Sequence, residues 1–195
     1  MSRTVNIALV GVGGQGILLA SEVVSLAAML SGYDVKKSEV HGMAQRGGSV
    51  MSEVRYGEKV HSPLIPYGEA DFLVSFEALE AVRNADMLAL GGTALINTQT
   101  IIPVTVSSGQ QPWVDDLDDR IERAFQNRIL IDALTAARDA GNIRTVNMVM
   151  TGALSRLMEI NEDAWLQAMK EVIPSKYLEV NLRAFEAGKE AASTK

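Results

Sequence analysis

The sequence predicts a layered α/β protein with a mixed, mainly parallel sheet and a helical C-terminal part. Residues 5–10 form an apolar, partly β-branched run that ends in glycine, which is typical of a buried parallel strand. Residues 16–31 carry apolar side chains at helical spacing and are followed by Gly32, a helix-ending residue. Residues 33–40 favour a second strand. This strand–helix–strand order gives the chain a Rossmann-like start.

The middle of the chain predicts further strands. Residues 49–56 alternate between apolar and polar side chains, and Gly57-Glu58 favours a turn into a short strand at 59–61. Such a hairpin would make the sheet mixed. Short apolar runs predict other strands at residues 70–75, 93–97, 101–106 and 129–131.

Helical spacing predicts the remaining elements. The intervening helices are expected at residues 76–84, at 115–127 and up to Gly141. The last third reads as helix throughout: one helix spans residues 144–158, Asn161 caps the next, and Pro174 separates that helix from the last one. One domain is expected to span residues 1–195.

Composition excludes several classes of function. The net charge is −6 and there is no Lys/Arg cluster, which argues against nucleic acid and anionic membrane surfaces as partners. The chain has no cysteine, so it contains no disulfide, no thiolate ligand for an iron–sulfur cluster and no thiol nucleophile. The spacing of His41 and His61 fits no zinc motif, and we expect no metal site. The N-terminus resembles neither a signal peptide nor a membrane span, so a cytoplasmic location is expected.

The first chemical motif is a glycine turn after the first strand. Gly11, Gly13 and Gly16 fit the dinucleotide pattern G-x-G-x-x-G, in which helix N-terminal amides hold a pyrophosphate. Its cofactor-binding candidates are Gly13, Gly14, Gln15 and Gly16. A ribose-binding acid is equivocal, because Glu39 comes late and Asp34 lies at the start of the second strand. The turn therefore predicts either a nucleotide site or tight packing of a helix on the sheet.

A second glycine-rich loop spans residues 41–49. Its candidate side chains for a substrate or an interface are His41, Gln45, Arg46 and Ser49. A histidine and an arginine on a flexible backbone can hold an anionic ligand or a partner subunit. The alternative is a solvated loop with a tight Gly47-Gly48 turn.

No catalytic residue can be assigned from the remaining motifs. The nucleophile pattern G-x-S-x-G is absent, which leaves hydrolase chemistry unsupported. The acid pairs at residues 115–116 and 118–119 are explained by the dipole of the helix that they begin.

Taken together, the two loops resemble those of the gamma-type subunit of 2-oxoacid:ferredoxin oxidoreductases. The pattern comprises residues 11–16, a helix, residues 41–50 and the strand-to-helix junction at residues 71–77. Within that family the second loop is most similar to the beta subunit of indolepyruvate ferredoxin oxidoreductase. The resemblance covers most of the chain.

The resemblance implies a role in thiamine-dependent oxidative decarboxylation of a 2-oxoacid, with indolepyruvate or another arylpyruvate favoured. The products would be acyl-CoA and CO₂, with CoA as a substrate and ferredoxin as the electron acceptor. Thiamine diphosphate, magnesium and iron–sulfur clusters would belong to a large partner subunit, and this chain would hold no cofactor and be inactive alone. The alternatives are a gamma subunit acting on 2-oxoglutarate, pyruvate or a branched-chain 2-oxoacid, a free-standing NAD- or flavin-binding oxidoreductase, and an assembly module without a ligand.

Overall fold

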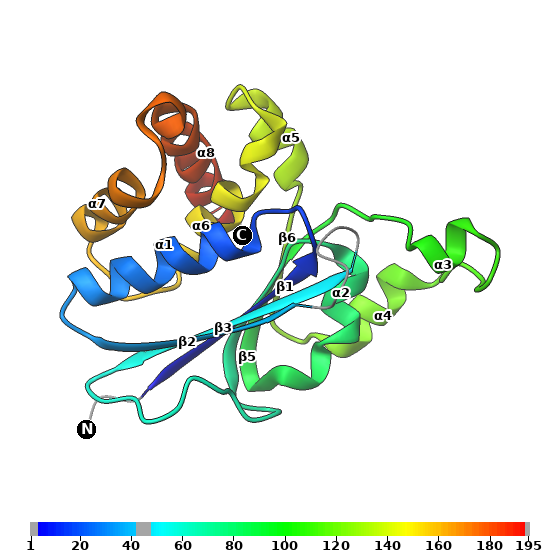
Figure 1. The fold of residues 1–195 in the computed structure, drawn as a ribbon. Helices are drawn as coiled ribbons and strands as arrows, with labels where there is room; N and C mark the ends of the chain where they lie inside the picture. The colour runs from blue at the N-terminus through cyan, green and yellow to red at the C-terminus, as the bar shows by residue number, and fades with distance from the viewer. Residues whose placement is uncertain (1–3, 42–47, 194–195) are drawn as a thin grey trace.

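The fold is a six-stranded sheet between two layers of helices (Figure 1). The computed structural model describes residues 4–41 and 48–193, and of His41 it describes the backbone only. The strands are β1 (Val5–Val12), β2 (Asp34–His41), β3 (Ser49–Gly57), β4 (Ala70–Ser75), β5 (Leu88–Asn97) and β6 (Arg128–Ile131). The helices are α1 (Ile17–Leu30), α2 (Ala78–Arg83), α3 (Val104–Ser107), α4 (Leu117–Ala124), α5 (Ala133–Asp139), α6 (Val146–Ser155), α7 (Glu162–Val172) and α8 (Ser175–Ser193), with 3-10 turns at Ala85–Met87 and Ile143–Thr145.

The strands follow the order β2-β3-β1-β4-β5-β6. Strands β1, β4, β5 and β6 are parallel, whereas β3 is antiparallel to both of its neighbours, β1 and β2. The predicted α/β class and the mixed, mainly parallel sheet are therefore confirmed. The strand that makes the sheet mixed is β3, which lies between the two strands that are first in the chain.

Each face of the sheet has its own apolar core. In β1, Ile7 and Leu9 point into the larger core, and the intervening Ala8 and Val10 point into the smaller one. Helices α1 and α5 to α8 cover the first face, and α2 and α4 cover the second (Figure 1). This alternation explains why residues 7–10 of β1 are all apolar, because a strand buried on both faces has no side open to water.

Helices α6 and α8 cross at two glycines. A Cβ atom on Gly152 would lie 1.9 Å from the carbonyl oxygen of Phe185, and one on Gly188 would lie 1.9 Å from the carbonyl oxygen of Val149. The two backbones touch at distances that only glycine permits. This contact fixes the last helix on the helix that begins beside the glycine turn.

The predicted hairpin at residues 57–61 is wrong. Strand β3 ends at Gly57, and the described chain forms no strand between residues 58 and 69. The backbone N–H of Val60 donates to the carboxylate of Asp34 at 2.8 Å instead of to a strand. Pro63 and Pro66 then remove two donors that a strand would need.

The strand predicted at residues 101–106 is also wrong. Pro103 is the residue before α3, and its carbonyl accepts the N–H groups of Val106 and Ser107. Its φ of −60° already suits the first turn of a helix. The strand that follows β5 in the sheet is β6, not residues 101–106. Several helices are shorter in the structure than predicted. The helix expected at residues 115–127, for example, spans only Leu117–Ala124.

Candidate functional site

The candidate site lies where the parallel strands end. The carboxyl ends of β1, β4, β5 and β6 meet at one edge of the sheet, and the antiparallel β3 begins there. The helix after β1 covers one face, whereas the helix after β4 covers the other. In open α/β sheets, ligands bind at such a switch point between neighbouring strands. The glycine turn at residues 13–16 follows β1 at this point.

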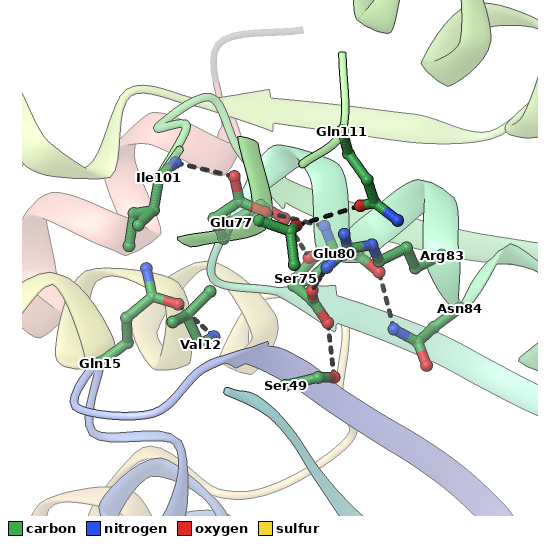
Figure 2. Close-up of polar contacts among 11 residues, drawn as sticks. Val12, Gln15, Ser49, Ser75, Glu77, Glu80, Arg83, Asn84, Ile101 and Gln111 are labelled. Carbon is green, nitrogen blue, oxygen red and sulfur yellow. Dashed lines mark hydrogen bonds and ion pairs between the residues drawn. The ribbon is translucent and has the colours of Figure 1, made fainter. Parts of the chain in front are cut away.

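Gln15 holds the glycine turn against the neighbouring strand. Its Oε1 accepts the backbone N–H of Val12 at 2.7 Å (Figure 2). Its Nε2 donates to the carbonyl of Phe76 at 2.8 Å. A Cβ on Gly11 would lie 2.7 Å from that Oε1, so glycine at position 11 makes room for the side chain. Both ends of the Gln15 amide are thus used inside the protein, and its role here is to position the turn.

Gly16, the residue before α1, has a conformation that suits glycine. Its φ is +78°, in the left-handed region. The Nδ2 of Asn147 donates to the Gly16 carbonyl at 3.3 Å, and a Cβ on Gly16 would lie 2.6 Å from that nitrogen. Asn147 is almost fully buried, at 3% exposed, and it belongs to α6. Asn147 of α6, far along the chain, therefore holds the turn in place.

Two buried glutamates organise the other side of the edge. Glu77 precedes α2, and its carboxylate accepts the backbone N–H groups of Glu80 at 2.8 Å and Ile101 at 2.9 Å (Figure 2). Burial raises the pKa of the Glu77 carboxyl above its ordinary value, while these two hydrogen bonds lower it. The acid thus ties the start of α2 to the segment that follows β5.

Glu80 connects α2 to the start of β3. Its carboxylate accepts the hydroxyl of Ser49 at 2.6 Å and the guanidinium of Arg83 at 2.6 Å (Figure 2). Of the residues predicted for the second loop, Ser49 is therefore a structural link to α2. Glu80 was not predicted for the site, because its partner lies thirty-one positions earlier in the sequence. Gln45 and Arg46 lie outside the described residues, as does the side chain of His41.

An open apolar groove runs along the start of α1. Its volume is about 430 Å³, and its described lining consists of Gly13, Gly14, Gly16, Ile17, Leu18, Leu19 and Val50. The groove brings three of the four predicted cofactor-binding residues together with Val50 of β3. Leu18 is exposed there, so the groove presents an apolar wall to whatever lies against this edge.

The strand order removes the geometry that a dinucleotide site needs. In a Rossmann unit the acid that binds the ribose stands on the strand next to β1. Here β3 lies between β1 and β2, so Glu39 is two strands away, a distance of roughly 10 Å at the usual strand spacing. Glu39 also forms an ion pair with Lys37 at 3.0 Å. The glycine turn resembles the dinucleotide pattern, but the position of this acid does not.

The residues at this edge do not fit thiamine diphosphate with its metal, or an iron–sulfur cluster. Cysteine is absent from the sequence. Within residues 4–41 and 48–193, no three His, Asp or Glu side chains gather where they could hold a metal ion. A magnesium–diphosphate group needs several oxygen ligands around the ion. We therefore derive no chemical step through such a group in this chain.

Comparison with known proteins identifies the family. The sequence profile described as "Pyruvate ferredoxin/flavodoxin oxidoreductase" matches residues 6–191. The chain belongs to this family. As expected from the two loops, it is a subunit of a 2-oxoacid:ferredoxin oxidoreductase. No helix in the described part of the chain is both long enough and apolar enough to cross a membrane.

Individual relatives match along nearly the whole chain. The chain is 42% identical to the indolepyruvate oxidoreductase subunit IorB of Thermococcus kodakarensis, covering 96% of this chain and 95% of that protein. Identity to the IorB of Pyrococcus horikoshii is 41%, with the same coverage. A 2-oxoglutarate synthase subunit KorC of Methanothermobacter marburgensis is 30% identical over 97% of this chain and 96% of that protein.

A solved structure matches the fold. The gamma subunit of a keto/oxoacid ferredoxin oxidoreductase from Geobacter sulfurreducens superposes with a TM-score of 0.73 at 24% identity, covering 98% of this chain and 99% of that one. The α/β arrangement described above is thus shared with that subunit.

Proposed function

We propose that this chain is the small subunit of an indolepyruvate-type 2-oxoacid:ferredoxin oxidoreductase. In this proposal the complex converts an arylpyruvate and CoA to an acyl-CoA and CO₂ and passes the electrons to ferredoxin. The observation that carries it is the identity of 42% to a subunit named for indolepyruvate, against 30% to one named for 2-oxoglutarate synthase. Both comparisons span almost the full chain, so the difference is not one of coverage.

The reaction centre belongs to a large partner subunit in this proposal. That subunit holds thiamine diphosphate, magnesium and the iron–sulfur clusters. The absence of cysteine from this sequence supports this division, because clusters are held by thiolates. Neither nucleic acid nor a membrane is a partner, and the complex is cytoplasmic.

The carboxyl edge of the sheet supplies this chain's contribution. The turn at residues 13–16 is fixed by Gln15 and Asn147, and the start of β3 is fixed by Glu80. A surface fixed in this way keeps its shape when a partner or substrate binds, which lowers the entropic cost of binding. We infer that this edge, with the loop of residues 41–49, shapes the partner's substrate site from outside.

Reconstitution tests the proposal. The chain and its large subunit are purified separately and mixed, and CoA-dependent ferredoxin reduction is measured with indolepyruvate, phenylpyruvate, pyruvate and 2-oxoglutarate. We expect no turnover with the chain alone and the highest kcat/KM with an arylpyruvate for the mixture. Full activity of the large subunit without this chain would refute the subunit role. Preference for 2-oxoglutarate would refute the substrate class alone.

Variants of the second loop test the role of the edge. Arg46→Ala and His41→Ala are compared in the assembled complex with Arg156→Ala, an exposed arginine beyond the far end of α6. If the loop contacts the substrate, the first two raise KM or lower kcat, whereas Arg156→Ala leaves both unchanged. Unchanged kinetics in all three variants would make the loop a packing element. Titration of the isolated chain with NAD(H), NADP(H), FAD and FMN checks the nucleotide alternative, for which we expect no micromolar binding.

A further inference from the structure

One segment of the chain projects from the body of the fold. It runs from residue 98, after β5, to residue 114, before α4, and Figure 1 shows it in green as an extension that carries α3. We call residues 98–114 the arm. None of the four residues of α3 is buried. Helix α3 therefore contributes no buried residue to either apolar core of the isolated chain.

The composition of the arm differs from that of the rest of the surface. No charged residue occurs between Asp86 and Asp115, in a chain whose charged fraction is 22%. Ile102 is 61% exposed and Val104 is 71% exposed. The buried centres of protein–protein interfaces are likewise apolar and depleted of charge. Ile102 and Val104 thus have the character of an interface centre, whereas residues 105–111 beyond them are uncharged but mostly polar.

The arm is anchored at both ends. At its start, the N–H of Ile101 donates to Glu77 (Figure 2). The carbonyl of Gln99 accepts the N–H of Ala78 at 2.9 Å. At its return, Trp113 and Val114 pack against the smaller core. Anchored ends present the tip in one orientation, and this reduces the ordering cost of binding.

The base of the arm is acidic. A groove of about 240 Å³ beside α4 is lined in part by Thr98, Thr100, Asp118, Asp119, Glu122 and Arg128. Arg128 forms an ion pair with Glu122 at 3.2 Å, so the negative charge of the groove comes from Asp118 and Asp119. A complementary partner would offer an apolar pocket for Ile102 and Val104, with lysine or arginine opposite these carboxylates. A second copy of this chain is a poor fit, because it brings the same acidic groove and a net charge of −6.

We propose that the arm is the element through which this chain docks on the large subunit of its complex, with Ile102 and Val104 entering an apolar pocket flanked by basic residues. This inference rests on the proposed function, which supplies the identity of the partner. The root of the arm lies at the carboxyl edge, bound to Glu77. Docking through the arm therefore brings the glycine turn and the start of β3 toward the same partner.

Titration of the chain against its large subunit tests the proposal. Ile102→Asp is compared with Ile143→Asp, which alters an isoleucine of similar exposure, 57%, outside the arm. We expect Ile102→Asp to weaken binding about 100-fold, as for a residue at the centre of an interface. Ile143→Asp should stay within about threefold of the wild type, as expected of a residue outside an interface centre.

A charge reversal tests the role of the two aspartates beside the arm separately. Asp118→Lys combined with Asp119→Lys should weaken binding about tenfold and reduce its dependence on salt. Urea unfolding of each variant verifies that it folds. Turnover of the complex should recover when the Ile102→Asp chain is added at a saturating concentration, because the substitution alters docking and not chemistry.

The outcomes separate the two proposals. If the wild-type chain does not bind the large subunit, the proposed function fails, and this inference fails with it. If the wild type binds and Ile102→Asp binds equally well, the arm alone is refuted. Self-association of the wild-type chain that Ile102→Asp abolishes, with binding to the large subunit intact, would also overturn the assignment of the partner.

Discussion

Replacement of Gly16 by alanine should be far more costly than the same change at Gly14. Both glycines lie in the turn after β1 and both have positive φ, +78° and +104°. A Cβ on Gly14 meets nothing within 4 Å, whereas a Cβ on Gly16 would lie 2.6 Å from Nδ2 of Asn147. The two variants thus share backbone strain and differ in packing.

The magnitudes follow from these two contributions. A left-handed conformation costs an L-residue about 1–2 kcal/mol, which is the whole effect expected for Gly14→Ala. At Gly16 the buried Asn147 must also move by several tenths of an ångström, which weakens its hydrogen bond to the Gly16 carbonyl. Overpacking of this kind costs a further 1–3 kcal/mol or so. We therefore expect Gly16→Ala to lower the free energy of unfolding by about 2–5 kcal/mol.

Urea unfolding of the isolated chain, followed by far-ultraviolet circular dichroism, measures both effects. The variant Asn147→Ala supplies the control. This variant removes Nδ2 and leaves only its Cβ, 3.3 Å from a Cβ at position 16, so in its background Gly16→Ala should cost little beyond the backbone strain. The double-mutant cycle should then give a coupling of about 2 kcal/mol. Equal destabilisation by Gly14→Ala and Gly16→Ala, or no coupling, would refute the idea that Asn147 fixes the turn.

Three further predictions concern other contacts. Gly152→Ala should lower the free energy of unfolding in urea by about 2–3 kcal/mol, because its Cβ would meet the Phe185 carbonyl; a stabilised variant would contradict this. The pKa of Glu77 is raised in the folded chain, so binding of its proton stabilises the fold. This stabilisation is complete below the ordinary pKa range of a carboxyl and is lost as pH rises through the raised pKa. Glu77→Gln should abolish this pH dependence when the free energy of unfolding is measured against pH. Ser49→Ala should cost about 1 kcal/mol in thermal unfolding through the lost bond to Glu80, and an unchanged Tm would argue against that bond.

Local patterns in the sequence were enough to predict much of the fold. Sequence patterns predict β1, α1 and the helices of the last third, because their buried apolar residues recur at the spacing of a strand or a helix. The position of β3 was missed, since pairing with β1 and β2 joins residues far apart in the chain. The strand predicted at residues 101–106 failed for a local reason, the helix-starting Pro103.

The site was predicted only in part for the same reason. The glycine turn can be recognised from the sequence, but the residues that hold it in place cannot. Gln15 reaches a carbonyl sixty-one positions away, and Asn147 reaches one at a separation of 131. The one available signal for Glu77 was its place at the end of the strand-to-helix junction of residues 71–77.

The position of β3 also has a consequence for how the chain folds. Strands β1 and β2 are parallel, but neither is complete without β3 between them, and Val5 pairs with Tyr56. A nascent chain that has emerged only as far as β2 therefore has no hydrogen-bonded sheet to form. Because such distant pairings must close a long loop first, folding of this sheet should be slow relative to helix formation. Until then β1, apolar on both faces, is the segment most in need of protection from aggregation.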